Sequence, residues 1–415
     1  MKLLHITPHL GGGVGKAHAA LSRVLPGEVE QTFLLLEPAG DRRYADVIRA
    51  SGAQVLTAAG LDDVGRLARQ ADIVQFEFWN HPRLMECLGR CAFPPMRSVF
   101  WSHISGLSRP VIQPGLIAEA GRFVFSSPVS LTVPALAGLP KAARARTSVV
   151  NSGFGFEHAA TGARPGKAGP GIAYLGTVDF VKMHPGFFDA IDALDGDGVC
   201  ATVWGRLDAA GAVSARAAAM RRPDRVRFGG QTADPAQALA SAGIFFYPLQ
   251  PDHYGTGENA LIEAMSLGLV PVVLANPAEM AIVSHGETGF VCASIDECAQ
   301  TLRKLQASPA VLKRVGANAA RQAAANHTPA RAAGDFTAVW QALLDEPARP
   351  HDFRRIVGES PLDWFLATQC LPGETWDPTD SEGAKTLSKG SLASFAHAFP
   401  GSELDAPRQS AGGAA

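Results

Sequence analysis

Short apolar segments alternate with amphipathic segments along most of the chain. The apolar segments are nearly continuous, a pattern typical of strands buried on both faces of a parallel sheet. Residues 16–25 and 61–70 lie between them and carry apolar side chains at helical spacing. This alternation predicts a doubly wound α/β domain. Its expected strands are residues 2–7, 31–36, 53–58, 72–78, 97–103, 121–127 and 147–151.

Residues 161–171 interrupt the pattern with a run rich in glycine and proline, TGARPGKAGPG, which indicates a linker. The alternation then restarts, so we expect domains over residues 1–160 and 172–330, with a helix at 331–346 that returns to the first domain. Two such halves place a binding site in the cleft between them, facing the carboxyl ends of their strands. The second set of expected strands is residues 171–177, 199–205, 224–230, 243–249, 270–275 and 288–293.

Residues 347–415 lack this rhythm. They hold scattered aromatic residues and end in a low-complexity stretch, DAPRQSAGGAA. We interpret them as a C-terminal extension packed on the domains, with a disordered end.

Composition narrows the functional class. A length of 415 residues is enough for two or three domains, and a hydrophobic fraction of 47% is enough for a sizeable core. Lys and Arg number 37 against 39 Asp and Glu, so the basic excess typical of nucleic-acid-binding proteins is missing. Six sparse cysteines do not form a disulfide framework. With no apolar run of about 18 residues, we expect a cytoplasmic protein, and peripheral contact with the inner membrane face stays open.

A glycine-rich segment, HLGGGVGKA, follows the first expected strand at residues 9–17. Backbone N–H groups at such a turn can bind a phosphate at a helix N-terminus. Leu10 and Ala17 do not fit a Walker A loop, and Lys16 does not fit a dinucleotide fingerprint. By itself, the segment is equally consistent with a tight turn between a strand and a helix.

A second segment, at residues 254–291, carries three of its four glutamates at candidate binding positions. Glu258 lies in a glycine-broken loop, Glu263 in the expected helix that follows, and Glu279 after the next strand. Carboxylates near a helix N-terminus can accept the paired hydroxyl groups of a ribose, while free backbone N–H groups bind phosphate. The structural alternative is that Glu258 caps the helix and Glu263 is solvated.

This second segment resembles the nucleotide-sugar signature of retaining GT-B glycosyltransferases of family 4 (glycosyl transferases group 1). Further matches are the Gly11–Gly13 loop, His103 in WSHISG, Asn151-Ser152-Gly153, and Gly176 with Lys182. Within the signature, the matching residues are Glu263-Ala264-Met265, Gly268, Pro271-Val272-Val273, Glu279 and Thr288-Gly289-Phe290.

The resemblance implies a GT-B fold, in which a first domain binds the acceptor and a second binds the donor. It places Lys182 at the donor diphosphate, Glu263 at the ribose diol, and His103 near the sugar and the acceptor. A lysine ammonium also suits the charge that develops as a nucleoside diphosphate departs. The expected catalytic residues are Lys182, His103 and Glu258. The expected donor-binding residues are Gly11, Gly12, Gly13, Gly176, Arg206, Gly257, Asn259, Ala260 and Glu263.

Two positions depart from the family pattern. The family pairs two glutamates eight residues apart, but Gly255 stands eight residues before Glu263, and Glu258 is the nearest carboxylate. The family also often has an arginine after the glycine at 176, where this chain has Thr177. We hypothesise that Arg206 supplies the missing charge.

Other candidates have a structural alternative that we favour. The Asp195-Gly196-Asp197 triplet matches a metal-binding pattern but is typical of a turn. Cys87 and Cys91 are spaced for one helix face, and we expect them to be buried rather than to ligate a metal. His9 is expected to be satisfied within its loop. Glu77 is expected to face the cleft, where it contacts an acceptor or caps the next helix.

The sequence therefore predicts a glycosyltransferase that moves a sugar from a nucleoside-diphosphate sugar to a hydroxyl acceptor. The resemblance implies retention of configuration and no essential metal, with domain closure over the linker excluding water. Three alternatives stay open: another GT-B enzyme such as a nucleotide-sugar epimerase or phosphorylase, a Rossmann-type dehydrogenase, and a non-catalytic relative that binds a nucleotide sugar or glycan. No nucleic-acid partner is expected.

Overall fold

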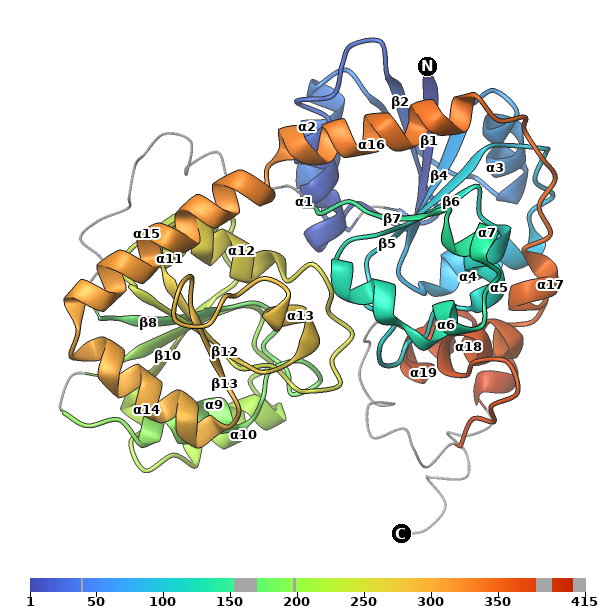
Figure 1. The fold of residues 1–415 in the computed structure, drawn as a ribbon. Helices are drawn as coiled ribbons and strands as arrows, with labels where there is room; N and C mark the ends of the chain where they lie inside the picture. Colours follow the sequence, from blue (N-terminus) through green and yellow to red (C-terminus); the bar gives the residue numbers. More distant parts are fainter. Residues whose placement is uncertain (39, 153–169, 197–198, 378–389, 406–415) are drawn as a thin grey trace, which may run out of the picture. The chain divides into compact units, whose positions relative to one another are not determined.

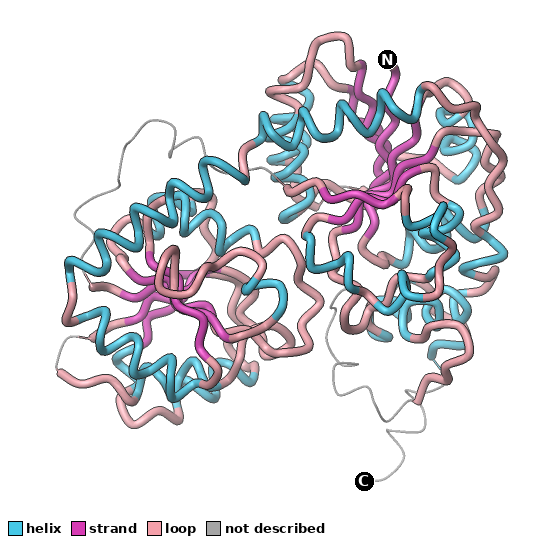
Figure 2. Tube along the Cα trace, in the orientation of Figure 1, coloured by secondary structure: helices cyan, strands magenta, loops and turns pink. Residues whose placement is uncertain are grey.

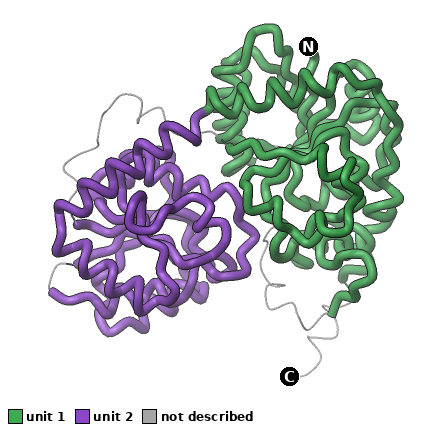
Figure 3. The backbone as a smooth tube through the Cα atoms, viewed as in Figure 1, with its two compact units in different colours: residues 1–152, 329–415 green, residues 153–328 purple. Residues whose placement is uncertain are grey.

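The computed structural model describes the chain apart from residues 39, 153–169, 197–198, 378–389 and 406–415. The chain divides into two compact units, residues 1–152 with 329–415 and residues 153–328 (Figure 3). Of the expected linker, only residues 170–171 are described, and the expected disordered end from residue 406 lies outside the described residues.

The first unit is built around a parallel sheet. Among the described residues, the sheet has seven strands in the order β3-β2-β1-β4-β5-β6-β7 (Figure 1). All these strands are parallel, and successive strands are added on one side of β1 up to β3 and on its other side from β4 onward. Doubly wound sheets bind ligands at such a switch point, beyond the carboxyl ends of their strands. The strands are β1 (Lys2–Thr7), β2 (Glu30–Leu35), β3 (Gln54–Thr57), β4 (Ile73–Phe78), β5 (Ser98–Ser102), β6 (Arg122–Phe125) and β7 (Thr147–Val149).

Helices cover the faces of the first sheet (Figure 2). They are α1 (Gly12–Leu21), α2 (Arg43–Ala50), α3 (Leu61–Ala68), α4 (Pro82–Arg90), α5 (Pro114–Glu119), α6 (Pro134–Ala137), α7 (Lys141–Arg144) and α16 (Pro329–Leu344). Helix α16 packs on α1, and the indole N–H of its Trp340 donates to Gln75 Oε1 on β4 at 3.0 Å. Chain segments more than 260 residues apart in sequence therefore share one core.

The second unit repeats the architecture with strand order β10-β9-β8-β11-β12-β13. Its strands are β8 (Ile172–Leu175), β9 (Ala201–Trp204), β10 (Val226–Gly230), β11 (Ile244–Tyr247), β12 (Val270–Leu274) and β13 (Phe290–Cys292). Its helices are α9 (Gly186–Asp192), α10 (Ala212–Ala218), α11 (Pro235–Leu239), α12 (Asn259–Ser266), α13 (Pro277–Met280), α14 (Ile295–Gln306) and α15 (Pro309–Asn326).

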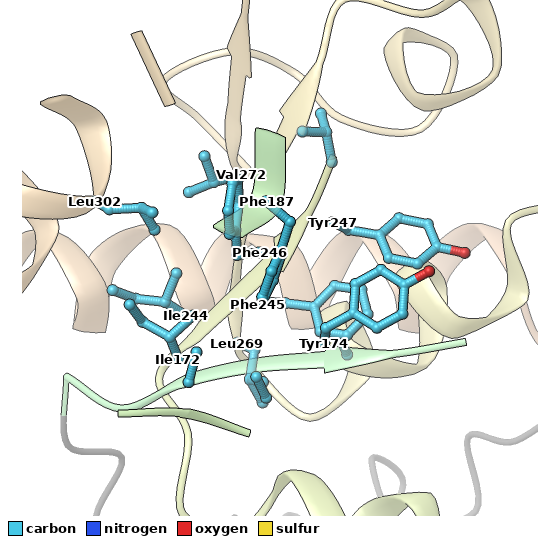
Figure 4. Close-up of a cluster of buried hydrophobic side chains, with 14 of the residues drawn as sticks. Ile172, Tyr174, Phe187, Ile244, Phe245, Phe246, Tyr247, Leu269, Val272 and Leu302 are labelled. Carbon is cyan, nitrogen blue, oxygen red and sulfur yellow. The ribbon is translucent and has the colours of Figure 1, made fainter. Parts of the chain in front are cut away.

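The core of the second unit is made largely of strand residues with both faces buried. Ile244 to Tyr247 of β11 are all at most 1% exposed, as expected for a central parallel strand. Figure 4 shows Tyr174 and Tyr247 in this cluster, with their hydroxyl groups on the same side. Their rings lie 5.3 Å apart, so the cluster presents two phenols at one edge of an apolar core.

Every apolar segment singled out in the sequence forms a strand, and the predicted fold of two doubly wound units is confirmed. The first helix differs from its prediction, because it begins at Gly12 rather than residue 16 and ends at Leu21. Gly11 is extended and Gly12 takes φ 61°, so glycines make the turn into the helix without an intervening loop.

The C-terminal extension contains helices α17 (Arg354–Val357), α18 (Pro361–Gln369) and α19 (Leu392–Ala398), which belong to the first unit. Phe353, Trp364, Phe365 and Phe395 are each at most 1% exposed and join the same core cluster as β4 and β5. The extension thus completes the core of the first unit.

No helix among the described residues has the length and apolarity needed to cross a lipid bilayer.

Candidate active site

Three polar side chains meet at the carboxyl edge of the second sheet. Lys182 comes from the loop after β8, Tyr247 ends β11, and Glu258 precedes α12. Lys182 Nζ lies 3.0 Å from Glu258 Oε2, and the Tyr247 hydroxyl donates to the same oxygen at 2.9 Å. The carboxylate of Glu258 is fully buried, and the Lys182 side chain is 14% exposed. The structure thus brings together two of the residues expected to be catalytic.

The surroundings keep both members of this pair charged. Burial by itself raises the pKa of Glu258, but the opposing effects of Lys182 and His253 are larger, so its pKa lies below the usual value. Burial likewise lowers the pKa of Lys182, but the Glu258 carboxylate outweighs it and the net pKa is raised. The site therefore holds an ammonium group in a water-poor environment.

Glu258 has an unusual backbone conformation. Its φ of 33° lies in the left-handed region, which is uncommon for residues other than glycine and costs free energy. Its side chain makes no capping hydrogen bond to α12, and Glu263 is 7% exposed. The structural alternative is therefore wrong, because Glu258 does not cap the helix through its side chain and Glu263 is not solvated.

A second carboxylate, Glu279, lies behind this pair. His253 Nδ1 accepts the Gly255 backbone N–H at 3.0 Å, so the neutral ring carries its hydrogen on Nε2, which lies 3.1 Å from Glu279 Oε1. Glu279 is fully buried, and burial raises its pKa. Neither Tyr247 nor His253 was predicted from the sequence. Tyr247 could have been noticed because it ends a strand, and His253 because it stands directly before the segment at residues 254–291.

The remaining donor-side candidates lie around the same edge. Gly176 follows β8 and has a φ of 154°. Gly205 follows β9, and a Cβ on it would lie only 2.2 Å from the Gly176 carbonyl oxygen, so the backbones are in close contact where the two strands end. Arg206 comes next and is exposed. Gly257 lies in the turn before α12, while Asn259 and Ala260 form its first turn, where backbone N–H groups lack helical partners.

In the first unit, the structure corrects the expectation for Glu77. This residue lies on β4 with no exposed surface, so it neither faces a cleft nor caps a helix. Its Oε2 is 2.9 Å from Nε2 of both His18 and His103, and its Oε1 is 3.1 Å from His5 Nδ1. Burial by itself raises the pKa of Glu77, but the three histidines outweigh it and hold the pKa well below the usual value.

The glycine segment after β1 lies at the carboxyl edge of this sheet. Gly12 and Gly13 begin α1, and the N–H of Gly11, the residue before the helix, donates to His9 Nδ1 at 3.1 Å. His9 is therefore satisfied within its loop, as expected. Gly15 is also required, because a Cβ there would lie 1.7 Å from the Leu10 carbonyl oxygen.

Two groups of side chains have the composition of a metal site within the described residues: His5, His18 and Glu77, and His9, Glu37 and His81. In the second group, Nδ1 of His9 and of His81 accepts a backbone N–H, so Nε2 of each neutral ring carries hydrogen and has no lone pair for a metal. In the first group, His5 Nδ1 lies at hydrogen-bond distance from Glu77 Oε1, 3.1 Å away, while His18 Nε2 lies 2.9 Å from Glu77 Oε2 without the geometry of a hydrogen bond.

The Asp-Gly-Asp triplet and the Cys87/Cys91 pair have the structural roles expected from the sequence, as far as their residues are described. Gly196 has φ 86°, typical of a turn, and Asp195 lies 3.3 Å from Arg303, while Asp197 lies outside the described residues. Cys87 is buried, and Cys91 contacts the Leu61 carbonyl oxygen.

Residues 169–308 match the family described as Glycosyl transferases group 1. The chain is similar in structure to HepE (Alr3699) of Anabaena in complex with UDP, with a TM-score of 0.65 at 16% identity, covering 82% of this chain and 100% of that one. It is also similar to the lipopolysaccharide outer core galactosyltransferase WaaB, with a TM-score of 0.60 at 12% identity, covering 82% of this chain and 99% of that one. No curated protein sequence matches. The predicted GT-B fold and the resemblance to group 1 are confirmed.

Proposed function

We propose that this chain, whose residues 169–308 match the family Glycosyl transferases group 1, transfers a sugar from a nucleoside-diphosphate sugar to a hydroxyl acceptor. The observation that carries the proposal is the buried ammonium of Lys182, held 3.0 Å from Glu258 at the carboxyl edge of the second sheet. Departure of a nucleoside diphosphate places negative charge on a phosphate oxygen, and a positioned cation stabilises that charge most strongly where water is scarce.

The donor diphosphate binds beside Lys182 in this proposal. The unpaired N–H groups of Asn259 and Ala260 at the start of α12 contribute partial positive charge, and Glu263 on the same helix accepts the ribose hydroxyls. HepE has been crystallised with UDP-glucose, which makes a uridine donor the first to test.

The transfer proceeds with retention and without an essential metal. The bond between the anomeric carbon and the phosphate oxygen breaks while the acceptor hydroxyl forms a new bond on the same face. The acceptor proton moves to the departing phosphate oxygen, so atoms and charge balance. Lys182 stabilises the phosphate as it leaves. In this proposal the enzyme acts in the cytoplasm.

The test has two stages. Thermal unfolding is first measured with UDP, GDP, ADP, dTDP and NAD, with and without EDTA. A ligand at about 100 times its dissociation constant stabilises the fold by about 2.7 kcal/mol, and we expect one nucleoside diphosphate to do so in the wild type but not in Glu263→Ala.

The nucleotide found in this way fixes the donors for an activity screen, whose product is analysed by NMR for its anomeric configuration. A shift with NAD alone contradicts the proposal, as does an epimerised sugar nucleotide as the product. Inversion at the anomeric carbon contradicts the retaining mechanism only.

A further inference from the structure

A pocket of about 460 Å³ opens in the first unit at the amino ends of β1, β2 and β3. It lies at the edge of the sheet where the chain begins, one strand length, roughly 20 Å, from the carboxyl edge that holds the glycine segment (Figure 1). Its volume falls in the range of about 300–1,000 Å³ that is usual for small-molecule sites. The proposed transfer reaction does not use this pocket.

The buried part of the pocket combines apolar and polar groups. Its buried lining residues are Leu3 and Leu4 on β1, Gln31 on β2 and Ser22, which directly follows α1. Ser22 is 7% exposed, and its hydroxyl has no hydrogen-bond partner among the described residues. A hydroxyl hidden in this way loses the hydrogen bonds that water gives it in the unfolded chain, so a molecule bound in the pocket is expected to restore them.

Neutral polar side chains predominate in the exposed part of the pocket. Ser51, Gln54 and Gln70 are exposed, and their hydroxyl and amide groups can both donate and accept hydrogen bonds. The two charged lining residues, Lys2 and Glu30, are register partners on neighbouring strands, so their opposite charges offset each other. The lining therefore suits an uncharged ligand that carries several hydroxyl groups.

The ends of α1, α2 and α3 favour the same kind of ligand. Each of these helices ends within two residues of a lining residue, Ser22, Ser51 or Gln70. The last carbonyl groups of a helix have no partner within it, and they carry partial negative charge. They can accept hydrogen bonds from hydroxyl groups, whereas they repel phosphates and carboxylates. A nucleotide or a sugar phosphate therefore fits this pocket poorly.

We propose that this pocket is a second binding site, which takes an uncharged mono- or disaccharide. The apolar lining packs against the C–H groups of a sugar ring, Ser22 hydrogen-bonds one hydroxyl, and the glutamine side chains bind others. The proposal does not depend on the proposed function, because binding in this pocket requires no transfer of sugar.

The experiment measures binding to the full chain by isothermal titration calorimetry. The probes are glucose, galactose, N-acetylglucosamine, maltose and lactose, with glucose 6-phosphate as the anionic comparison. We expect at least one neutral sugar to bind, and glucose 6-phosphate to bind more weakly than glucose. If no neutral sugar shows saturable binding, the pocket holds only water and the proposal is wrong. Tighter binding of glucose 6-phosphate than of every neutral sugar also overturns it.

Removal of one hydroxyl tests whether the sugar occupies the pocket. Ser22→Val deletes the hydroxyl with little change in volume, and we expect about two- to tenfold weaker binding. The matched control is Ser148→Val on β7, which deletes another hydroxyl without a partner among the described residues, outside the pocket. This control should bind the sugar as the wild type does.

A second pair of variants fills the pocket. Gly27 lines it, and a Cβ there meets nothing within 4 Å, so we expect Gly27→Trp to fold and to lose sugar binding. Gly138→Trp makes the same change at a position outside the pocket that is equally open, and it should retain binding.

Unchanged affinity in both Ser22→Val and Gly27→Trp would place the sugar elsewhere and overturn the proposal. Binding that survives Gly27→Trp but is lost in Glu263→Ala would assign the sugar to the donor site, with the same consequence. If Gly27→Trp does not fold, Ser22→Val decides by itself. If the wild type transfers no sugar from any donor, the proposed function fails, while calorimetry still decides whether the pocket binds a sugar.

Discussion

Glu258 occupies the space into which a side chain at Gly255 would extend. A Cβ at position 255 would lie 1.9 Å from Glu258 Oε1 and 2.7 Å from His253 Nδ1. The family pattern described in the sequence analysis expects a glutamate at position 255, and the structure shows that any side chain there would collide with the Glu258 carboxylate. The glycine at 255 leaves room for the carboxylate of Glu258, three residues further along the chain.

Gly255→Ala should therefore displace the Glu258 carboxylate. Overpacking of this kind costs roughly 1–3 kcal/mol, and we expect a lower Tm together with weaker nucleoside-diphosphate binding. The control is Gly334→Ala on α16, where a Cβ meets nothing within 4 Å and the helix gains about 1 kcal/mol. Unchanged nucleotide binding in Gly255→Ala would show that the position of the Glu258 carboxylate does not matter for donor binding.

Lys182→Met should abolish turnover, with a loss of at least about 100-fold in kcat. It also leaves Glu258 buried without its cation, which costs about 3–5 kcal/mol of folding stability. The double variant Lys182→Met/Glu258→Gln separates the two effects, because it should recover most of the Tm and none of the turnover.

Arg206→Ala tests the source of additional positive charge. If Arg206 assists Lys182, its loss should reduce kcat by roughly tenfold while the Tm stays within about a degree, because the side chain is exposed. Full turnover in Arg206→Ala, with none in Lys182→Met, would show that Lys182 acts without it.

The stability of the fold should depend on His5 at mildly acidic pH. Burial lowers the pKa of His5 to about 4 from 6.5, so between these values the unfolded chain binds a proton that the folded chain does not. Unfolding free energy should therefore fall as pH is lowered from 6.5 to 4, on the order of 3 kcal/mol in total. Urea unfolding across this range should show the slope in the wild type and a smaller one in His5→Asn. Equal slopes would mean that His5 is already protonated in the folded chain.

Gly89 is required by the C-terminal extension. A Cβ at this position would lie 2.4 Å from Trp364 Nε1, which donates to the Gly358 carbonyl oxygen at 3.0 Å. Gly89→Ala should lower the stability of the first unit by roughly 1–3 kcal/mol without weakening nucleotide binding. Gly138→Ala, where a Cβ meets nothing within 4 Å, should leave the Tm unchanged. An unchanged Tm in Gly89→Ala would mean that the extension does not hold the core.

Periodicity was sufficient to predict the sheets, because a buried parallel strand is apolar whatever its partners. Glu77 shows where that reasoning fails. A carboxylate near a strand end is expected to face solvent, and only the three-dimensional packing of His5 and His18 makes burial tolerable. The helices of the extension were missed for a similar reason, since α17 and α19 are too short to show a period and are stabilised by the core they join.

Lys182 and Glu258 were singled out from the sequence, but their pairing was not, since it depends on the left-handed backbone at residue 258. Tyr247 was invisible in the same way. A strand residue in an apolar run looks like core, and only its hydroxyl contact with Glu258 gives it a second role.

The first unit is discontinuous, because residues 329–415 complete a core begun by residues 1–152. During synthesis, the ribosome releases the first seven strands long before Trp340, Phe353 and Trp364 exist to cover them. The second unit is continuous in sequence and needs nothing made later. Nascent chains usually fold their N-terminal domain first, but here the inserted unit is expected to mature earlier, because the core of the first unit is complete only after the C-terminal residues have been made.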